Sequence, residues 1–224
     1  MKPAFDPAPL PAHADKQQPR EASEPYDPRF RRLIGAEGWV GLPAAVRRRF
    51  SKRVIGERVV IYPGVIRTAR FSALGWVFAQ LCRLVGAPLP LGREHGMPAA
   101  VSVMEDPQGC GQFWTRTYAR KRGFPQVIHS AKRFGGPTGL EEHIGFGIGM
   151  ALQVSAIENG IAFRSDHYFV SILGKRFALP GWLSPGETLV KHRHVDDASF
   201  VFSLELTHAR LGELVYQEGL FHDA

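Results

Sequence analysis

The sequence predicts an α+β fold in which a mainly antiparallel β-sheet of about nine to ten strands curls into a barrel-like shape. From Arg58 onward, apolar residues alternate with polar ones, which is the period of a strand with one buried face. Turn-forming pairs interrupt these runs at Asn159-Gly160, Leu173-Gly174 and Asp196-Asp197. Only one stretch reads as a long helix, and a sheet this large would leave exposed edges unless it curled on itself.

Residues 1–28 are expected to be a disordered tail. They hold seven prolines among Ala, Asp, Lys and Gln, a composition that cannot bury enough apolar surface to offset the entropy of ordering. No apolar stretch typical of a signal peptide is visible in them. Residues 29–224 are expected to form one β-rich domain.

A short helical preface is predicted over residues 29–53. Asp27 and Pro28 supply the start of one helix that Gly35 ends, and Pro43 can begin a second. The two helices would pack together in front of the sheet.

The preface carries the whole net charge of +7. It holds eight Lys or Arg against one Glu, and the rest of the chain is balanced. This segment is either a solvated helical face or a docking surface for an acidic partner or an anionic membrane, with Arg47, Arg48 and Arg49 at its centre. No nucleic-acid motif accompanies it, so a specific nucleic-acid partner is not expected.

The main helix is predicted over residues 73–85, with Ser72 as its N-cap and Gly86 as its stop. Its apolar face is expected to bury against the sheet; this face consists of Leu74, Val77, Phe78, Leu81, Leu84 and Val85. Residues 58–72 read as a strand pair or as one long strand bent around Pro63-Gly64. The other predicted strands are 99–105, 111–120, 126–134, 146–157, 161–169, 170–179, 187–195, 199–208 and 213–222.

Composition places the chain among folded soluble proteins. The residues are 44% hydrophobic, yet no apolar run reaches the roughly 18 residues needed to span a bilayer, and a cytoplasmic location is expected. Cys82 and Cys110 are too few for a disulfide scaffold and lack the spacing of a zinc site. We therefore expect neither a metal nor a cofactor.

Five segments carry a family resemblance: "FRRLIGAEGWVGLPAAVRRRF", "LCRLVGAPLPL", "WTRTYARKRGFPQVIHSAKRFGGPTGLEEHIGFGIGMAL", "LPGWLSPGETLVKHRHVDD" and "THARLGELVYQEGLFHD". Together they resemble a bacterial domain family of unknown function, found alone or C-terminal to saccharopine-dehydrogenase-like NAD(P)-binding domains. The resemblance covers nearly all of residues 29–224 and implies no established activity. The fused relatives imply a separate NAD(P)-dependent reductase as a candidate partner. No such domain is expected in this sequence. "GFGIGMAL" at 145–152 misses the third glycine of the nucleotide-binding fingerprint and is expected to open a strand.

The richest candidate site lies on the strand 111–120. Gln112, Trp114, Arg116 and Tyr118 share one face of it. Facing inward, this stripe would line a cavity with one fixed cation and two amphipathic aromatic rings, which suits an apolar ligand with a carboxylate or phosphate. Facing outward, it would be a surface cluster with the Arg116 stem lying over the rings.

Two further positions could do acid/base chemistry. His129, on the next strand, could be a general base or a hydrogen-bonded structural residue. In the last strand, Glu213 and Gln217 could lie inside beside Arg116, where a buried carboxylate with a raised pKa would suit proton transfer, or they could be structural.

Two other polar groups offer weaker signals. Residues 135–149, "GGPTGLEEHIGFGIG", could form a lid, a plain connector or, less naturally, a metal site, because consecutive Glu-Glu-His side chains point apart. His192 and His194 share a strand face and could chelate a metal, or belong to an exposed charged strand without a third ligand.

Three functions remain open at this point. The first is binding of a hydrophobic small molecule, lipid-like with an acidic head group, in a barrel-like cavity built from Trp114, Arg116, Tyr118, His129, Glu213 and Gln217. The second is an acid/base enzyme of isomerase or cyclase type that uses His129 or Glu213, or an accessory domain to a separate reductase. The third is an interaction module that docks through residues 29–53.

Overall fold

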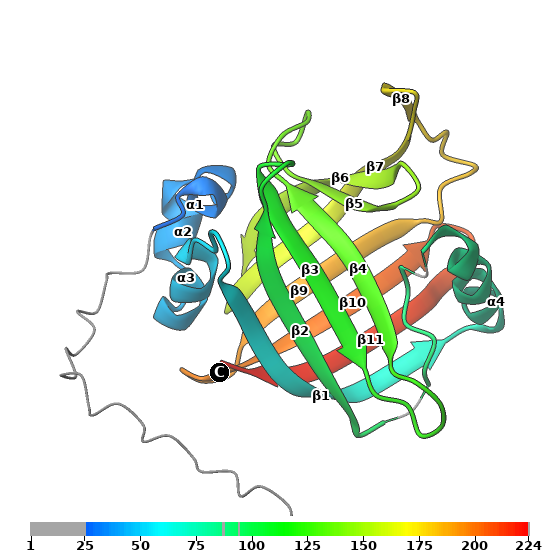
Figure 1. Cartoon of the computed structure of the whole chain (residues 1–224), viewed down its shortest axis with the longest axis horizontal. Coiled ribbons are helices and arrows are strands. Elements are labelled where there is room, and N and C mark those ends of the chain that lie inside the picture. Colours follow the sequence, from blue (N-terminus) through cyan, green and yellow to red (C-terminus); the bar gives the residue numbers. More distant parts are fainter. Residues whose placement is uncertain (1–25, 87, 94, 224) are drawn as a thin grey trace, which may run out of the picture.

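Antiparallel pairing continues from strand to strand around a full circle, which closes the sheet into a barrel (Figure 1). The computed structural model describes residues 26–86, 88–93 and 95–223. Its strands are β1 (Val59–Phe71), β2 (Met97–Asp106), β3 (Gly111–Tyr118), β4 (Gln126–Arg133), β5 (Glu141–Gly145), β6 (Ile148–Ile157), β7 (Gly160–Ile172), β8 (Lys175–Ala178), β9 (Glu187–His194), β10 (Ser199–His208) and β11 (Gly212–His222). Its helices are α1 (Arg29–Ile34), α2 (Ala36–Val40), α3 (Ala44–Ser51), α4 (Ala73–Leu81) and the short 3₁₀ helix η1 (Cys82–Val85).

Ten strands form the ring within the described residues, and β8 stands outside it. The pairing of β6 with β7 closes the circle, and β8 pairs with β7 alone. The first half of β7 pairs with β9 as far as Arg164 and Leu189, whereas its last residues pair with β8. The barrel wall is therefore split beyond Arg164, and the segment 179–186 follows this split.

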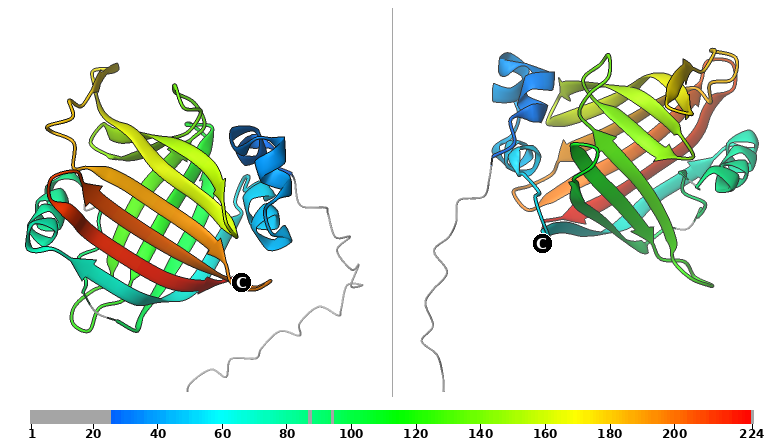
Figure 2. Two further views of the ribbon diagram at one scale, coloured as in Figure 1. Left: turned by 180° about the vertical axis from the view of Figure 1, so that it is seen from behind. Right: turned by 45° about the horizontal axis from the view of Figure 1, so that its top comes forward.

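Helices lie at the two ends of the barrel, with α1, α2 and α3 at one end and α4 at the other (Figures 1 and 2). The three preface helices close their end with aromatic side chains: the rings of Phe30 and Phe50 lie 6.1 and 5.9 Å from that of Phe163 on β7. Ordered structure begins before α1, since Tyr26 forms a β-bridge with Lys52. Residues 1–25, most of the predicted tail, lie outside the described residues.

Helix α4 packs differently from the sequence expectation. Ser72 caps it as predicted, with its hydroxyl accepting from the backbone N–H of Gly75 at 3.0 Å. The buried stripe, however, is made of small residues, Gly75, Ala79 and Cys82. A Cβ at Gly75 would lie 1.8 Å from the carbonyl oxygen of Leu214, so the helix lies directly on the β11 backbone.

The predicted apolar face of α4 is consequently wrong for most of its members. Leu74, Val77, Leu81 and Leu84 are exposed, and only the sides of Phe78 and Val85 contribute to the core. Close approach of the helix to the sheet requires small residues at the contact, which turns the large side chains outward. In the described part of the chain, no helix is long and apolar enough to cross a membrane.

Most predicted strands are confirmed to within two or three residues, as are the turns at Asn159, Leu173-Gly174 and Asp196-Asp197. Residues 58–72 form one long strand, and its two halves pair with β2 and β11. The segment 135–149 is neither a lid nor a plain connector, because it supplies β5 to the wall and makes the β5–β6 hairpin. The many glycines in this segment indicated a loop, although a strand begins at Glu141.

The close packing of α4 gives a prediction with an unusual sign. In most helix interiors Gly→Ala stabilises by about 0.5–1 kcal/mol. Here Gly75→Ala should lower the free energy of unfolding by about 1–3 kcal/mol, because the methyl group would overlap the Leu214 carbonyl. Urea unfolding measures this change.

Gly181→Ala is the matched control, since nothing lies within 4 Å of a Cβ built there. It should change stability by less than about 0.5 kcal/mol. An unfolding free energy of Gly75→Ala equal to or above that of the wild type would contradict the packing described for α4.

Candidate functional site

Three charged side chains meet inside the barrel. Arg116 Nη2 donates to Ser130 Oγ at 3.0 Å and to Glu142 Oε1 at 3.4 Å. Lys132 Nζ donates to Glu142 Oε2 at 2.7 Å. All four residues are buried, and they come from three adjacent strands, β3, β4 and β5. We call Arg116, Lys132 and Glu142 the lumen cluster.

Strand alternation places the lumen cluster. Arg116 lies on the face of β3 that points into the barrel, and Ser130 and Lys132 lie on the inward face of β4. Lys132 and Glu142 are direct cross-strand partners between β4 and β5, which brings their side chains together on one face. The sequence thus positions two cations and one carboxylate in the core of a sheet.

The cluster is electrostatically unbalanced. Burial alone would raise the pKa of Glu142, but Lys132 and Arg116 outweigh burial and hold this pKa at about 2. Burial lowers the pKa of Lys132, and Arg116 lowers it further, while Glu142 opposes both. The cluster therefore holds two basic groups against one carboxylate, and with all three ionised it carries one surplus positive charge. Arg116 Nε is also buried without a hydrogen-bond partner among the described residues.

A cavity of about 260 Å³ lies on the Arg116 side of the cluster and is partly open to solvent. Its walls come from α4, η1 and the strands β3, β5, β6, β7, β9 and β10, together with residues 88–89 and the segment 179–186. Most of the lining is apolar: Phe78, Cys82, Val85, Pro88, Leu89, Ile144, Ile148, Met150, Val170, Leu179, Leu183, Pro185, Val190, Leu204 and Leu206. Its polar groups are Arg116, Glu142, Tyr168 and Thr188, and the last two share a hydrogen bond of 2.7 Å between their hydroxyls.

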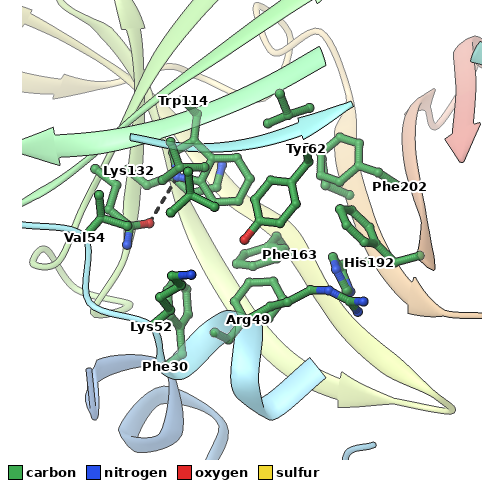
Figure 3. A pocket seen from close by; sticks show the side chains of 17 residues that line it. Phe30, Arg49, Lys52, Val54, Tyr62, Trp114, Lys132, Phe163, His192 and Phe202 are labelled. Carbon is green, nitrogen blue, oxygen red and sulfur yellow. Dashed lines mark hydrogen bonds between the residues drawn. The ribbon is translucent and has the colours of Figure 1, made fainter. Parts of the chain in front are cut away.

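A second and much smaller space, of about 50 Å³, lies on the Lys132 side, toward the preface helices. Figure 3 shows Phe163 at its centre, with Tyr62 and Phe202 from the wall and Arg49 and His192 side by side. The lumen cluster therefore divides the barrel interior into a large apolar cavity and a small aromatic space. Of these two interior spaces, the first comes near the size range of small-molecule sites, which begins at about 300 Å³. Wider hollows of about 300 and 600 Å³ lie elsewhere, and charged side chains contribute much of their lining.

His192 is unusual among the residues around the small space. Both ring nitrogens are buried without a hydrogen-bond partner within the described structure. Its ring stacks on Phe200 at 4.2 Å and meets Phe50 edge-on at 5.1 Å. Burial, followed by the positive charge of Arg49, lowers its pKa to about 3, so the imidazole is neutral at physiological pH. The expectation of an exposed charged strand is therefore wrong at His192.

The structure separates the six sequence-predicted binding residues. Four of them point inward: Trp114, Arg116, Tyr118 and Gln217. The β3 stripe therefore faces the barrel interior and not the solvent. The four residues do not share one cavity, however. Trp114 faces the small space, Arg116 the large cavity, and Tyr118 and Gln217 a separate hollow of about 20 Å³.

The two candidate acid/base residues lie on the outside. His129 is exposed and hydrogen-bonds Thr115 Oγ1 at 3.1 Å. Glu213 pairs with Arg70 on the outer face at 2.8 Å, and its side chain is not near Arg116. Strand phase explains both outcomes. His129 alternates with the inward Ser130. On β11 the register shift lies between Glu213 and Val215, which takes Glu213 out of phase with the inward Gln217. The carboxylate that does meet Arg116 is Glu142.

Two members of the lumen cluster were missed from the sequence. Lys132 is in phase with Ile128 and Ser130, so strand alternation carried the signal that it faces inward. Glu142 gave no comparable signal, because glycines surround it and its pairing to β4 depends on the tertiary fold.

Of the three central arginines, Arg47, Arg48 and Arg49, the last two form ion pairs within the fold. Arg49 is buried and pairs with Asp223 at 2.7 Å, and Arg48 approaches the same carboxylate at 3.5 Å. Arg47 Nε is buried. These contacts tie α3 to the C-terminal end of the barrel, and docking of this segment on an anionic surface stays a prediction. No group of three potential metal ligands is found within the described ranges.

The fold and site define a class: a closed antiparallel β-barrel with a partly open apolar cavity and a buried, positively charged cluster at its base. The chain belongs to the family described as Domain of unknown function (DUF4166), which matches residues 42–221. No curated protein matches the chain, and no solved structure matches it. The matched residues include every strand of the ring and all three members of the lumen cluster, but not α1 or α2.

The charge imbalance predicts that opposite members of the lumen cluster differ in their effect on stability. Glu142→Gln leaves two buried cations without a counter-charge and should cost about 3–5 kcal/mol. Lys132→Met leaves the Arg116–Glu142 pair and should cost much less or even stabilise. Chemical denaturation of each variant measures the difference.

Glu213→Gln is the control, because it breaks a solvent-exposed pair with Arg70 and should cost less than about 1 kcal/mol. If Lys132→Met proved as damaging as Glu142→Gln, the lumen cluster would be balanced and the surplus charge would not exist.

His192 predicts a dependence of stability on pH. Because its folded pKa of about 3 lies below the ordinary histidine value of 6.5, protons bind the unfolded chain first as the pH falls. Its contribution to stability is therefore complete above pH 6.5 and is lost between pH 6.5 and about 3, with a slope of up to about 1.4 kcal/mol per pH unit. His192→Phe should remove this slope, and thermal unfolding across that range tests it. Identical pH profiles for wild type and variant would show that the imidazole titrates normally.

Proposed function

We propose that the protein binds a small hydrophobic molecule with an acidic head group in the cavity beside α4. The observation that carries this proposal is the buried Arg116 guanidinium, which shares the Glu142 carboxylate with Lys132, at the base of a mainly apolar cavity. Desolvating a cation without a counter-charge is costly, and a bound anion would offset that cost. Apolar walls with a few convergent polar groups are also the general character of small-molecule sites.

The orientation of the ligand follows from the same contacts. Arg116 lies at the inner end of the cavity, while the side chains from η1, the β5–β6 hairpin and the segment 179–186 are apolar. A carboxylate would approach Arg116, whose guanidinium has a donor left over, and the apolar body would extend toward the outer end. The hydroxyls of Tyr168 and Thr188 already hydrogen-bond to each other, so this part of the wall does not require a polar group from the ligand.

The enzyme hypothesis draws less support from the geometry. His129 and Glu213, the acid/base candidates, lie on the outer surface and do not face the cavity. Inside it, Glu142 is held ionised by two cations and its depressed pKa does not suit a general acid near neutral pH. A separate oxidoreductase partner stays a prediction that rests on the sequence resemblance.

A matched pair of ligands tests the role of the head group. Dodecanoate and dodecanol share an apolar chain and differ in the carboxylate. The wild-type protein should bind dodecanoate about tenfold to a hundredfold more tightly than dodecanol, as expected for one charge-assisted hydrogen-bonding contact. In Arg116→Gln, which leaves the Lys132–Glu142 pair intact, this preference should disappear; titration calorimetry gives both affinities.

Two control variants sharpen the experiment. Arg70→Gln removes an outer-surface cation and should leave the preference unchanged. Val170→Trp places a larger side chain in the cavity wall and should weaken both ligands alike. Cys82 lines the cavity, and Cys110 is exposed, so bound ligand should protect only Cys82 from a neutral thiol reagent. Equal affinity for the acid and the alcohol in the wild type would refute the acidic head group.

A further inference from the structure

The barrel end that carries the cavity also carries the protein's most exposed large apolar side chains. In the described chain, five of them are at least 76% exposed, namely Leu173 (98%), Phe124 (91%), Trp182 (80%), Leu84 (78%) and Phe146 (76%). The segments that hold them, residues 82–85, 119–125, 146–147, 173–174 and 179–186, lie at the α4 end of the barrel, opposite α1–α3 (Figures 1 and 2). Among the residues described at the preface end, the most exposed large apolar side chain is that of Val40, at 67%.

Three of these exposed residues are sequence neighbours of residues that line the cavity. Val85 lines the cavity next to Leu84, Ile144 and Ile148 line it on either side of Phe146, and Leu183 lines it next to Trp182. The apolar surface of the cavity therefore continues outward onto the exposed tips.

At two of the tips, the turn contains a residue type that its backbone conformation disfavours. The β5–β6 and β7–β8 hairpins each use a two-residue turn with both residues at positive φ: Phe146 at 52° with Gly147, and Leu173 at 50° with Gly174. The first position of such turns prefers Asn or Asp, and a bulky apolar residue at positive φ is uncommon. The strain and the exposure both oppose Phe and Leu here, which indicates that the exposed side chains serve a purpose other than folding.

Helix α4 adds an apolar surface of the same kind. It packs through its smallest residues and turns Leu74, Trp76, Val77 and Leu81 outward. Large apolar side chains on the solvent side of a helix, with its small ones on the core, are the reverse of the usual pattern of a surface helix.

Four connecting segments at this end carry charges of one sign, whereas Glu187 and Glu213 on the neighbouring strand ends pair with Arg164 and Arg70. The four connecting segments 73–86, 119–125, 144–147 and 172–186 contain no acidic residue, and their basic residues are Arg83, Arg120, Lys121, Arg122, Lys175 and Arg176. Arg176 also pairs with Glu141 of the wall. The chain outside the preface is balanced overall, so this concentration of positive charge is local.

We infer that this end of the barrel, which we call the docking rim (Leu84, Phe124, Phe146, Leu173, Trp182 and the exposed face of α4), binds the surface of an anionic lipid bilayer. Aromatic and aliphatic tips would enter the headgroup region while the basic side chains meet lipid phosphates. The large cavity would then face the membrane, and its ligand would pass between bilayer and protein without crossing water. That last step rests on the proposed function, whereas the docking itself does not.

A bilayer fits this surface better than a protein partner does. The exposed side chains stand on separate convex loops, and a protein would need a complementary hollow for each one. A fluid interface accepts separate protrusions, and each basic residue near an anionic membrane adds to the binding.

Vesicle co-sedimentation tests the inference with the full chain. Wild-type protein should sediment with vesicles of phosphatidylcholine and phosphatidylglycerol, and much less with phosphatidylcholine alone. Its partition should weaken as the Debye length shrinks from about 10 Å at 0.1 M salt to about 3 Å at 1 M. The double variant Phe146→Asn, Leu173→Asn should lose binding at least about tenfold, because two large apolar side chains no longer enter the interface.

The same double variant separates docking from folding. Asn suits both turn positions, so its thermal stability should equal or exceed that of the wild type. Val40→Asn removes a comparably exposed side chain at the opposite end and should leave vesicle binding unchanged. Undiminished vesicle binding in the double variant, or absence of binding in the wild type, overturns the inference.

Dodecanoate titration of the same proteins keeps the two proposals distinguishable. Phe146 and Leu173 do not line the cavity, so the double variant should bind dodecanoate like the wild type. If the wild type binds dodecanoate but no vesicles, the inference that the docking rim binds a bilayer is wrong, whereas the proposed ligand binding in the cavity is supported. Vesicle binding without dodecanoate binding would support the docking rim and count against the acidic ligand.

Discussion

The barrel interior depends on one carboxylate between two cations. Glu142 is what allows Arg116 and Lys132 to occupy the inward faces of β3 and β4, positions that would otherwise have to be apolar. Its pairing also fixes the register of β5 against β4, because a shift by one residue would turn Glu142 outward and leave both cations unpaired. Local charge and global topology are thus coupled at this point.

The two ends of the barrel differ because of what the helices bring to them. At the preface end, Phe30 and Phe50 fill the lumen against Phe163, and Arg49 secures α3 through Asp223. At the other end, α4 and η1 contact the sheet mainly through the small residues Gly75, Ala79 and Cys82, which leave the space beneath unfilled. The split between β8 and β9 removes a further part of the wall, and an apolar cavity results.

Period-two alternation predicted most of the fold, because a strand with one buried face has apolar residues at every second position. The inward stripe of Trp114, Arg116 and Tyr118 was visible for the same reason, although the choice of inward or outward was not, since neither face of β3 is purely apolar. Errors arose where tertiary contacts decide: the contact face of α4 depends on its approach to Leu214, and the strand character of Glu141–Gly145 depends on pairing. For His129 and Glu213, the sequence did not show which face of the strand each side chain lies on, because that depends on the register between paired strands.

A crystal structure with dodecanoate carrying a bromine atom at the end of its chain would test the central claim most directly. The account predicts the carboxylate within hydrogen-bonding distance of the Arg116 guanidinium, with the anomalous signal of bromine at the outer end of the cavity near Val85 and Leu183. A bromine peak beside Arg116, with the carboxylate in solvent, would contradict it, because the buried surplus charge would then have no part in binding.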